Sequence, residues 1–292
     1  MNKLKVLILG SAGMAGHIIK KHLSSFPKKI EVYDVARSSK YVQPSFLFDV
    51  TDFSSLNNLI VDLKPDCIIN CIGILNDTAE SNPDLAILVN SYLPHFLESK
   101  TKASNCKIIH ISTDCVFSGL KGEYVEKDPK DGVGIYAQSK ALGEIINIKD
   151  LTIRTSIIGP ELNPDGIGLL HWFLNQKNDI TGYSNAFWSG VTTNELAKFI
   201  YFVLTERFNL NGIYHLTNNT KIDKCSLLEY FQSAFKKDEF KIISSDKYKI
   251  DKSFINTNND ILFEVSDYNN MINEMSDYIR KYKSLYQYDF SV

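Results

Sequence analysis

The sequence predicts an α/β protein built on a doubly wound parallel sheet, followed by a smaller and irregular C-terminal lobe. In the first half, short apolar runs alternate with stretches of helical pattern. Strand, helix and strand repeated in this order imply parallel strands joined by crossovers. After Gly159-Pro160 the alternation loosens, and Asn163-Pro164-Asp165-Gly166 forms a cluster of turn residues. The two halves of the chain therefore predict two parts of the fold.

The elements of the first half follow from their apolar runs and their start signals. Runs of strand length predict strands over Leu4–Leu9, Ile30–Tyr33, Phe46–Phe48, Cys67–Ile69, Lys107–Ile111 and Leu151–Arg154. Helices are expected over Met14–Ser24, Asp52–Leu63 and Pro83–Ser99. The last of these begins with a proline, whose fixed φ suits a first helical turn.

The second half predicts fewer and more scattered elements. Helices are expected near Gly168–Asn175, Thr193–Glu206, Ser226–Phe235 and Tyr268–Tyr282, with a strand at Gly212–Leu216. The aromatic stretch from Gly182 to Gly190 is expected to be a loop. The Lys- and Asp-rich stretch 236–252 is expected to lie on the surface.

A turn with three glycines joins the first strand to the first helix. Gly10, Gly13 and Gly16 permit positive φ and a close approach of the backbone to a pyrophosphate, which the free N–H groups of the helix start can bind. Glycines in such a turn can also serve packing alone, but their position after the first strand favours a dinucleotide. Ala12 and Met14 in the same turn are expected to contact it. Residues 1–160 are therefore assigned to an NAD(P)-binding Rossmann domain, to which a segment near 187–216 returns, and residues 161–292 to a substrate-binding lobe.

The nature of the dinucleotide depends on residues after the second and third strands. Asp34 is placed to accept the ribose hydroxyls of NADH, and Arg37 to bind the 2′-phosphate of NADPH, so both cofactors are expected to bind. The alternative interpretation is that both charges are simply solvated at a strand end. Asp49 is a candidate acceptor for the adenine amine. The segment Cys71-Ile72-Gly73 follows the fourth strand and is expected to line the same crevice.

A Tyr-x-x-x-Lys pair at Tyr136 and Lys140 is the candidate catalytic group. On a helix, residues four apart share a face, so an ammonium group there is expected to lower the pKa of the phenol toward the pH at which it acts. The pattern also occurs at Tyr248 and Lys252, because the chain has 15 tyrosines. Only Tyr136 follows an apolar strand that ends in hydroxyl and carboxylate groups, Ser112-Thr113-Asp114. We therefore assign catalysis to Tyr136.

Charge and cysteine content narrow the class of protein. The net charge of -2 gives no field that would attract nucleic acid or an anionic membrane. Five cysteines form no CxxC pair, so we expect reduced thiols, a cytoplasmic location and no metal site. No apolar run is long enough to span a membrane.

The motifs together resemble the extended short-chain dehydrogenases, and most closely the dTDP-4-dehydrorhamnose reductase family. The resemblance covers residues 4 to about 160 and continues more loosely through Gly190-Val191-Thr192-Thr193 and Gly212-Ile213-Tyr214-His215. Its landmarks occur in the family's order: Gly10-x-x-Gly13-x-x-Gly16, Pro65-Asp66-Cys67-Ile68-Ile69-Asn70, Val89-Asn90, Ser112-Thr113-Asp114-Cys115-Val116-Phe117, Gly122-x-Tyr124-x-Glu126, Tyr136-x-x-Ser139-Lys140-x-x-Gly143-Glu144 and Arg154-Thr155-Ser156.

The resemblance implies roles for the residues that match. Tyr136 would protonate the substrate oxygen, Lys140 would hold the nicotinamide ribose, and Thr113 would hydrogen-bond the reacting carbonyl. Thr155 would border the nicotinamide. Cys115 departs from the family, which commonly has an aromatic residue beside the substrate at that position, and Asn70-Cys71-Ile72-Gly73 replaces the usual Asn-Ala-Ala segment.

The substrate side is predicted more loosely. Asp114 and Cys115 are expected to contact the substrate because they follow Thr113. Trp188 is a candidate for a sugar or base pocket, or for ordinary core packing. Lys252 is a candidate for contact with a diphosphate, or a solvated lysine.

The resemblance implies reduction of a 4-keto-6-deoxy nucleotide sugar by NADPH or NADH, in bacterial surface polysaccharide biosynthesis. Two alternatives stay open: a nucleotide-sugar epimerase or dehydratase, and a non-catalytic NADP-binding regulatory subunit like that of methionine adenosyltransferase. Dehydratases usually have an acidic pair after the threonine, whereas here only Asp114 follows Thr113. The sequence leaves open the nucleotide, the stereochemistry of the sugar, the preferred cofactor and the oligomeric state, a homodimer included.

Overall fold

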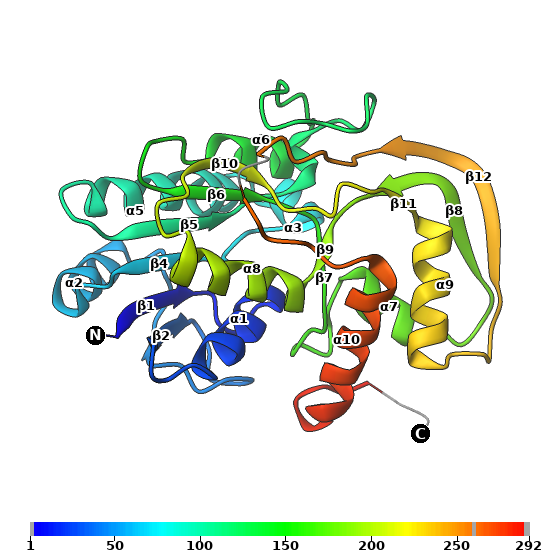
Figure 1. Cartoon of the computed structure of the whole chain (residues 1–292), viewed down its shortest axis with the longest axis horizontal. Coiled ribbons are helices and arrows are strands. Elements are labelled where there is room, and N and C mark those ends of the chain that lie inside the picture. Colours follow the sequence, from blue (N-terminus) through cyan, green and yellow to red (C-terminus); the bar gives the residue numbers. More distant parts are fainter. Residues whose placement is uncertain (1–2, 259–260, 289–292) are drawn as a thin grey trace.

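The main sheet is parallel and reverses its strand order at one point. The computed structural model describes residues 3–258 and 261–288. Within these residues the strands follow the order β10-β6-β5-β4-β1-β2-β3 (Figure 1). The chain fills one side of β1 first and then returns to the other side, which confirms the doubly wound sheet. The strand bounds are β1 Leu4–Leu9, β2 Ile30–Ala36, β3 Phe46–Leu47, β4 Cys67–Asn70, β5 Lys107–Ile111, β6 Leu151–Arg154 and β10 Gly212–His215.

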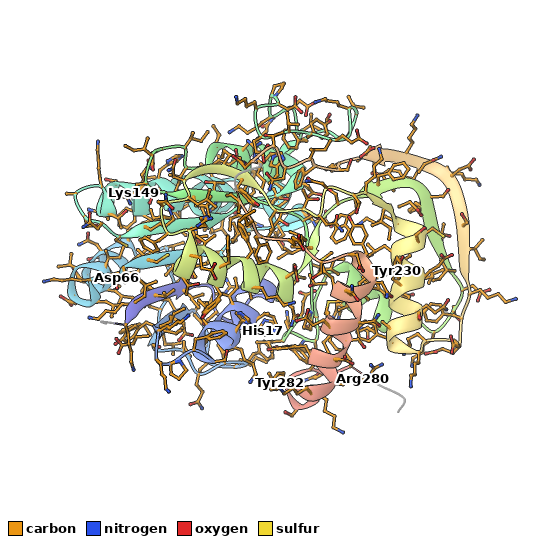
Figure 2. All side chains as sticks on the ribbon, viewed as in Figure 1. His17, Asp66, Lys149, Tyr230, Arg280 and Tyr282 are labelled. Atoms are coloured by element: carbon orange, nitrogen blue, oxygen red, sulfur yellow. The ribbon has the colours of Figure 1, made fainter. Side chains whose placement is uncertain are left out.

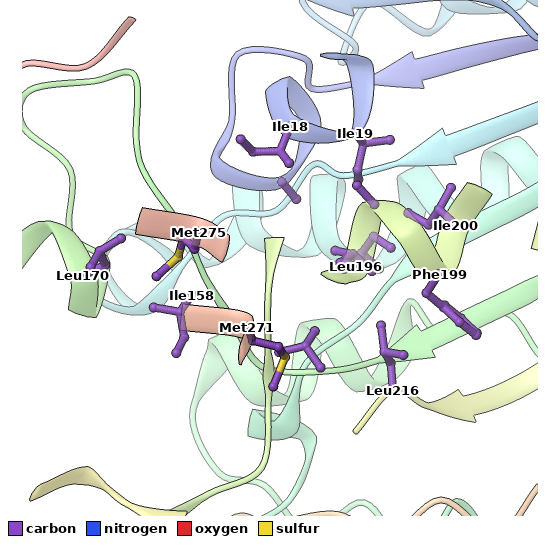
Figure 3. Close-up of a cluster of buried hydrophobic side chains, with 14 of the residues drawn as sticks. Ile18, Ile19, Ile158, Leu170, Leu196, Phe199, Ile200, Leu216, Met271 and Met275 are labelled. Carbon is purple, nitrogen blue, oxygen red and sulfur yellow. The ribbon is translucent and has the colours of Figure 1, made fainter. Parts of the chain in front are cut away.

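Helices cover both faces of this sheet because its strands are apolar on both sides. On one face, Ile8 of β1 belongs to a buried cluster with α1 (Met14–Ser24) and α8 (Thr193–Glu206). On the other face, Leu7 packs with α2 (Phe53–Leu63) and α5 (Leu93–Thr101). Figure 3 shows side chains of α1 and α8 in one cluster with Met271 and Met275 of α10 (Tyr268–Lys281). Each fully buried aliphatic side chain contributes about 1.5–3 kcal/mol, so both layers are fixed to the sheet.

The single helix expected over Pro83–Ser99 is interrupted. The structure has a short α4 (Pro83–Ala86), then a π-helical turn η1 (Ile87–Tyr92), then α5. At the junction the N–H of Leu93 bonds to the carbonyl of Leu88, five residues back. The next residue is Pro94, which has no N–H to give to the Asn90 carbonyl, and this accounts for the change of pattern.

The C-terminal lobe contains strands that the sequence analysis did not predict. A smaller sheet has the order β11-β8-β12, formed by Ile222–Asp223, Ile180–Trp188 and Ile242–Asp251. The predicted loop from Gly182 to Gly190 is therefore wrong for most of its length, which lies in β8. β12 is mostly exposed, as expected of the Lys-rich stretch, but it is a strand because it pairs in parallel with β8. Helix α9 (Lys224–Phe235) lies beside this sheet (Figure 1).

Three further segments connect the two parts of the fold. β7 (Ile157–Ile158) pairs with β9 (Val191–Thr192), and β9 leads directly into α8, which packs on α1. The chain then adds β10 to the edge of the main sheet beside β6. Near the other end of the chain, Tyr286 places its hydroxyl 3.0 Å from Nε2 of His17, which Figure 2 labels on α1. Residues far beyond 160 thus pack on the first part, and the domain boundary there stays a prediction.

Within the described residues, the remaining helices are α3 (Asn76–Ser81), α6 (Ile135–Leu142), α7 (Leu169–Leu174) and two short 3₁₀-helices, η2 (Asp114–Val116) and η3 (Lys283–Leu285). No helix in 3–258 or 261–288 combines the length and apolar character that crossing a bilayer requires.

Candidate active site

The turn after β1 adopts the conformation that its glycines were expected to allow. Gly10 has φ +88°, and a Cβ there would lie 2.7 Å from the Ile72 side chain. A Cβ on Gly16 would lie 2.1 Å from the Gly10 carbonyl oxygen, so α1 could not come this close to the turn with any other residue. Ala12 and Met14 are partly exposed and Gly13 is exposed, which leaves this part of the turn open to a ligand.

The start of α1 offers donors without a side-chain cap. Its N-cap residue is Gly13, which has no side chain that could cap the helix, and the first turn holds no acidic residue. Unpaired N–H groups and the helix dipole at this end attract an anion. The residues present therefore fit the pyrophosphate of a dinucleotide.

Asp34 and Arg37 lie in different environments. The Asp34 carboxylate is fully buried and pairs with the Lys20 ammonium at 2.9 Å, and it accepts hydrogen bonds from the N–H and hydroxyl of Ser45. Burial opposes ionisation, but hydrogen bonds from Ser11, Lys20 and Ser45 outweigh it and lower the pKa of Asp34. Arg37 is exposed after β2. The carboxylate is therefore occupied by protein donors, whereas the guanidinium is accessible.

Asp49 is exposed and is held by its own turn. Its carboxylate accepts the N–H of Thr51 at 2.9 Å and the Thr51 hydroxyl at 2.7 Å. These hydrogen bonds, with a smaller effect from nearby Arg37, lower the pKa of Asp49. Asp49 and Arg37 thus lie close enough to interact at the same end of the sheet.

The segment Cys71-Ile72-Gly73 lies at the carboxyl end of β4 and is fixed by Asn90. The Asn90 side chain accepts the N–H of Ile74 at 2.8 Å and donates to the Ile74 carbonyl at 2.9 Å. It also donates to the Ser139 hydroxyl at 3.0 Å, which ties this segment to α6. Asn90 therefore positions the wall of the crevice against the helix that carries Tyr136.

Thr113 and Tyr136 are brought together at the carboxyl end of β5. A side-chain hydrogen bond joins them, and the Thr113 hydroxyl donates to the Asp114 carboxylate at 3.0 Å. The same Thr113 oxygen accepts the N–H of Cys115 at 3.1 Å. Thr113 and Asp114 are both buried. Two hydroxyl groups thus converge where the β5 strand ends.

Lys140 lies one helical turn after Tyr136 and is buried beneath the same strand end. Its ammonium donates to the Ile111 carbonyl at 2.7 Å and lies 3.5 Å from Nε2 of His110. Burial lowers the pKa of Lys140 to about 8, although Glu144 and Cys71 act in the opposite direction. The lysine therefore carries a charge at neutral pH and lies close to Cys71 of the crevice.

The pKa of Tyr136 differs from the sequence-based expectation. Burial raises this pKa, and Cys115 and Asp114 add to the rise, whereas the hydrogen bond between Tyr136 and Thr113 lowers it. The expected lowering was wrong because desolvation of the phenolate dominates here. Tyr136 is thus protonated at neutral pH, which is the state that a proton donor needs.

A cavity of about 280 Å³ opens beside the Tyr136 side chain. Its lining includes Cys115 and Lys252, together with Asp77 and Glu80 of α3. The Lys252 ammonium lies 3.5 Å from the Cys115 sulfur. Burial raises the pKa of the Cys115 thiol to about 11, so the thiol is neutral. Lys252 is thus placed with the candidate catalytic residues.

The structure also gives the surroundings of Thr155, Tyr248 and Trp188. The Thr155 hydroxyl donates to the carbonyl of Leu216, directly after β10, at 3.2 Å, and Thr155 is buried. Tyr248 lies on β12 and is 50% exposed, so the helical spacing argument does not apply to its pair with Lys252. Trp188 is buried, and its ring centroid lies 5.8 Å from that of Tyr268.

Comparison with known proteins gives the family. The sequence profile of the family described as the RmlD substrate binding domain matches residues 4–251, most of the chain. The chain belongs to this family. The match confirms the resemblance that was based on the motifs.

Relatives and a solved structure agree with the assignment to the RmlD family. The chain is 28% identical over 221 residues to the spore coat polysaccharide biosynthesis protein SpsK of Bacillus subtilis, with 74% of each chain covered. It is 25% identical over 228 residues to a dTDP-4-dehydrorhamnose reductase of Burkholderia thailandensis, covering 74% of this chain and 73% of the relative. The dTDP-4-dehydrorhamnose reductase of Bacillus anthracis, solved in complex with NADP, has a TM-score of 0.80 at 20% identity, covering 94% and 98%.

Two residues near the site of this RmlD-family chain were not predicted from the sequence. Asn90 was noted only as part of a motif, and its hydrogen bonds to a distant segment could not be inferred from spacing. Lys224 lies at the start of α9, and its ammonium lies 5.1 Å from the Trp188 ring centroid and interacts with Asp114. A lysine in the first turn of a helix is electrostatically unfavourable, and that was the available signal.

Proposed function

We propose that the chain reduces a 4-keto-6-deoxy nucleotide sugar with NADPH or NADH, in bacterial surface polysaccharide biosynthesis. The observation that carries the proposal is the meeting of Thr113, Tyr136 and Lys140 at the carboxyl ends of the parallel strands, on the edge that also holds the glycine turn. Ligands of doubly wound sheets bind at this edge. The names of the reductase and polysaccharide relatives support the choice of substrate.

The three residues divide the chemistry. The Thr113 hydroxyl, which now donates to Asp114, would donate to the substrate carbonyl oxygen and polarise it. Tyr136, protonated because of its burial, would give its proton to the same oxygen as the alkoxide forms. Lys140 would hold the ribose hydroxyls of the cofactor while its other hydrogen bond fixes it to Ile111. The bound nicotinamide supplies the hydride.

The cofactor would be held by backbone at the turn and by side chains at the strand ends. Residues Gly10, Ala12, Gly13 and Met14 would surround the pyrophosphate, and Cys71-Ile72-Gly73 would border the nicotinamide half. Arg37 is exposed and would meet the 2′-phosphate of NADPH, while Asp49 lies near it for the adenine. The Asp34 carboxylate is paired with the Lys20 ammonium and accepts the Ser45 hydroxyl. To bind the ribose, Asp34 would have to break its ion pair with Lys20 or its hydrogen bond with Ser45. Thr155 directly follows β6, and its hydroxyl bonds to backbone, so it would border the nicotinamide through its position rather than through its hydroxyl.

The sugar would lie between Tyr136 and the second lobe. Asp114 and Cys115 would border it from the first lobe, and Lys252 from the second, because Lys252 and Cys115 share the cavity beside Tyr136. Trp188 is buried and would support this wall rather than stack on the ligand. We place the reaction in the cytoplasm, where the five free thiols stay reduced.

A turnover screen tests this proposal. The purified protein is mixed with 4-keto-6-deoxyhexoses linked to dTDP, UDP or GDP, each with NADPH and with NADH, and oxidation of the cofactor is followed at 340 nm. At least one nucleotide sugar should be reduced with continuous consumption of the cofactor. An epimerase or dehydratase begins by oxidising a C4 alcohol and returns the hydride, so it would convert dTDP-glucose or UDP-glucose in a parallel reaction without net consumption of the cofactor. A binding subunit would convert neither kind of sugar.

A further inference from the structure

His110 is a buried ionisable residue that the proposed chemistry does not use. It lies in β5, directly before Ile111, and its side chain is fully buried. Its Nδ1 lies 3.2 Å from the amide nitrogen of Asn70, and its Nε2 lies 3.5 Å from the Lys140 ammonium. Burial and the charge of Lys140 hold the pKa of His110 well below its usual range, so the ring is neutral at neutral pH. A neutral imidazole carries one proton, and its partners decide which nitrogen holds it.

The side-chain amide of Asn70 fixes the position of this proton. Its oxygen accepts the backbone N–H of Ile72 at 3.1 Å. Exchanging the amide oxygen and nitrogen would bring two donors, the amide nitrogen and this N–H, against each other. The amide nitrogen therefore faces His110, and because it can only donate, Nδ1 of the ring must accept. The single ring proton is thus on Nε2, the nitrogen that faces Lys140.

An N–H group beside Lys140 favours loss of the lysine's own proton. The charged ammonium has only donors, and one of them engages the Ile111 carbonyl at 2.7 Å. The neutral amine has a lone pair, which can accept the Nε2–H of His110. A hydrogen bond made only to the neutral form lowers the pKa of a base. His110 therefore acts in the same direction as burial, which is the main cause of the pKa of about 8 for Lys140.

The Glu144 carboxylate opposes this effect, because a negative charge favours the charged form of Lys140. Much of that negative charge is already neutralised by other residues. Arg154 binds the carboxylate through two hydrogen bonds of 2.7 and 2.8 Å, and the Lys130 ammonium lies 3.2 Å from it. The attraction that remains for Lys140 is therefore reduced.

Two further ionisable neighbours, Cys71 and Tyr136, are neutral where Lys140 titrates. Burial raises the pKa of the Cys71 thiol to about 12, and it also raises the pKa of Tyr136. His95 of α5 acts with Lys140 to lower the pKa of His110, so the imidazole ring also stays neutral in this range. Within this cluster, a change of charge near pH 8 therefore belongs to Lys140.

We propose that His110 is a positioning residue for Lys140: in the tautomer that Asn70 imposes, it directs an N–H at the lysine and sets the pH at which the lysine gives up its charge. The inference rests on the proposed function, in which charged Lys140 holds the ribose of the cofactor. His110 thus sets the alkaline limit of turnover without contact with the substrate or the cofactor.

Two NMR measurements on the ligand-free protein test the proposal without turnover. In protein labelled with ¹⁵N-histidine, correlations through the ring protons identify the protonated nitrogen of His110, whose signals the His110→Phe variant assigns. This nitrogen should be Nε2. In protein labelled with ¹³C-lysine, the ε-carbon of Lys140, assigned with Lys140→Met, should titrate near pH 8. In His110→Phe, which keeps a ring but no N–H, this titration should move up by about half to one pH unit.

The pH dependence of kcat on the accepted nucleotide sugar connects this titration to turnover. In His110→Phe the alkaline limb of kcat should move upward together with the Lys140 titration. His110→Leu should behave in the same way if the Phe variant is unstable. His171→Phe is the matched control, because His171 is also buried and has its Nδ1 3.4 Å from the Tyr288 hydroxyl, but lies on α7. Its titration and its alkaline limb should stay within about 0.2 pH unit of wild type.

Four outcomes decide the role of His110. A proton on Nδ1 of wild-type His110 would overturn the proposal without any variant. An unchanged or lowered Lys140 titration in His110→Phe would overturn it as well. A raised titration with an unchanged alkaline limb of kcat would overturn the link to turnover. A raised titration in a protein that reduces no nucleotide sugar would retain the effect of His110 on Lys140 and reject the reductase.

Discussion

Replacing Tyr136 with Phe removes one oxygen atom from the group proposed to protonate the substrate. The ring that packs beside the cavity stays, and only the hydroxyl that bonds to Thr113 is lost. Thr113 keeps its hydrogen bonds to the Asp114 carboxylate and the Cys115 N–H. The cost in stability should therefore be that of a single hydrogen bond, about 1 kcal/mol.

The cost in turnover should be much larger. General acid catalysis by a positioned side chain contributes about 10²–10⁴ in rate. This corresponds to about 3–5 kcal/mol of transition-state stabilisation. Cofactor binding should hardly change, because the glycine turn and Lys140 are untouched. The variant is thus expected to fold, to bind NADPH and to lose nearly all activity.

The assay combines steady-state kinetics on the accepted nucleotide sugar with fluorescence titration of NADPH and thermal melting. Tyr248→Phe is the control, since Tyr248 has the same spacing to a lysine but lies half exposed on β12. Its activity should equal that of wild type. If Tyr136→Phe retained kcat within about threefold of wild type, general acid catalysis by Tyr136 would be refuted.

Three further predictions follow from the site. Arg37→Gln should weaken NADPH binding by about tenfold, because a charged contact to the 2′-phosphate is lost. Titration with NADH should show unchanged affinity. Equal effects on both cofactors would place Arg37 away from the phosphate. A free 4-keto-6-deoxyhexose should have a kcat/KM at least about 10³-fold lower than its nucleotide-linked form, because the binding energy of the nucleotide part is lost. Comparable values for the two forms would refute the assignment of a nucleotide sugar as the substrate. Turnover should fall as the pH rises through about 8, where Lys140 loses its charge, while Tyr136, with its raised pKa, stays protonated. A profile that stays flat to high pH would contradict the role of Lys140.

The sheet was predictable because its strands are buried on both faces. Runs such as Leu4–Leu9 and Lys107–Ile111 are mostly apolar and do not alternate between apolar and polar residues, and their bounds agree with the structure. β8 and β12 were missed since polar residues, and in β8 a glycine, interrupt their apolar residues, and both strands are partly exposed. What makes β12 a strand is its pairing with β8, a contact between residues about 60 positions apart that local pattern does not encode.

The candidate site also has a part that the sequence predicts and a part that it does not. Thr113, Tyr136 and Lys140 could be chosen from sequence because the end of an apolar strand and the i, i+4 spacing on a helix fix their neighbourhood. The raised pKa of Tyr136 depends on burial by segments distant in sequence, and so do the partners of Asp34. Such desolvation and pairing arise only when the chain has folded, and spacing gives no measure of them.

The most direct test of the reductase follows the hydrogen that the cofactor donates. The protein is incubated with a 4-keto-6-deoxy nucleotide sugar and NADPH carrying deuterium at C4 of the nicotinamide, with each face labelled in turn, and the product is analysed by mass spectrometry and NMR. Our account predicts one deuterium at C4 of the sugar for each NADPH oxidised, from one of the two faces. Product formed without deuterium, or without oxidation of NADPH, would contradict it.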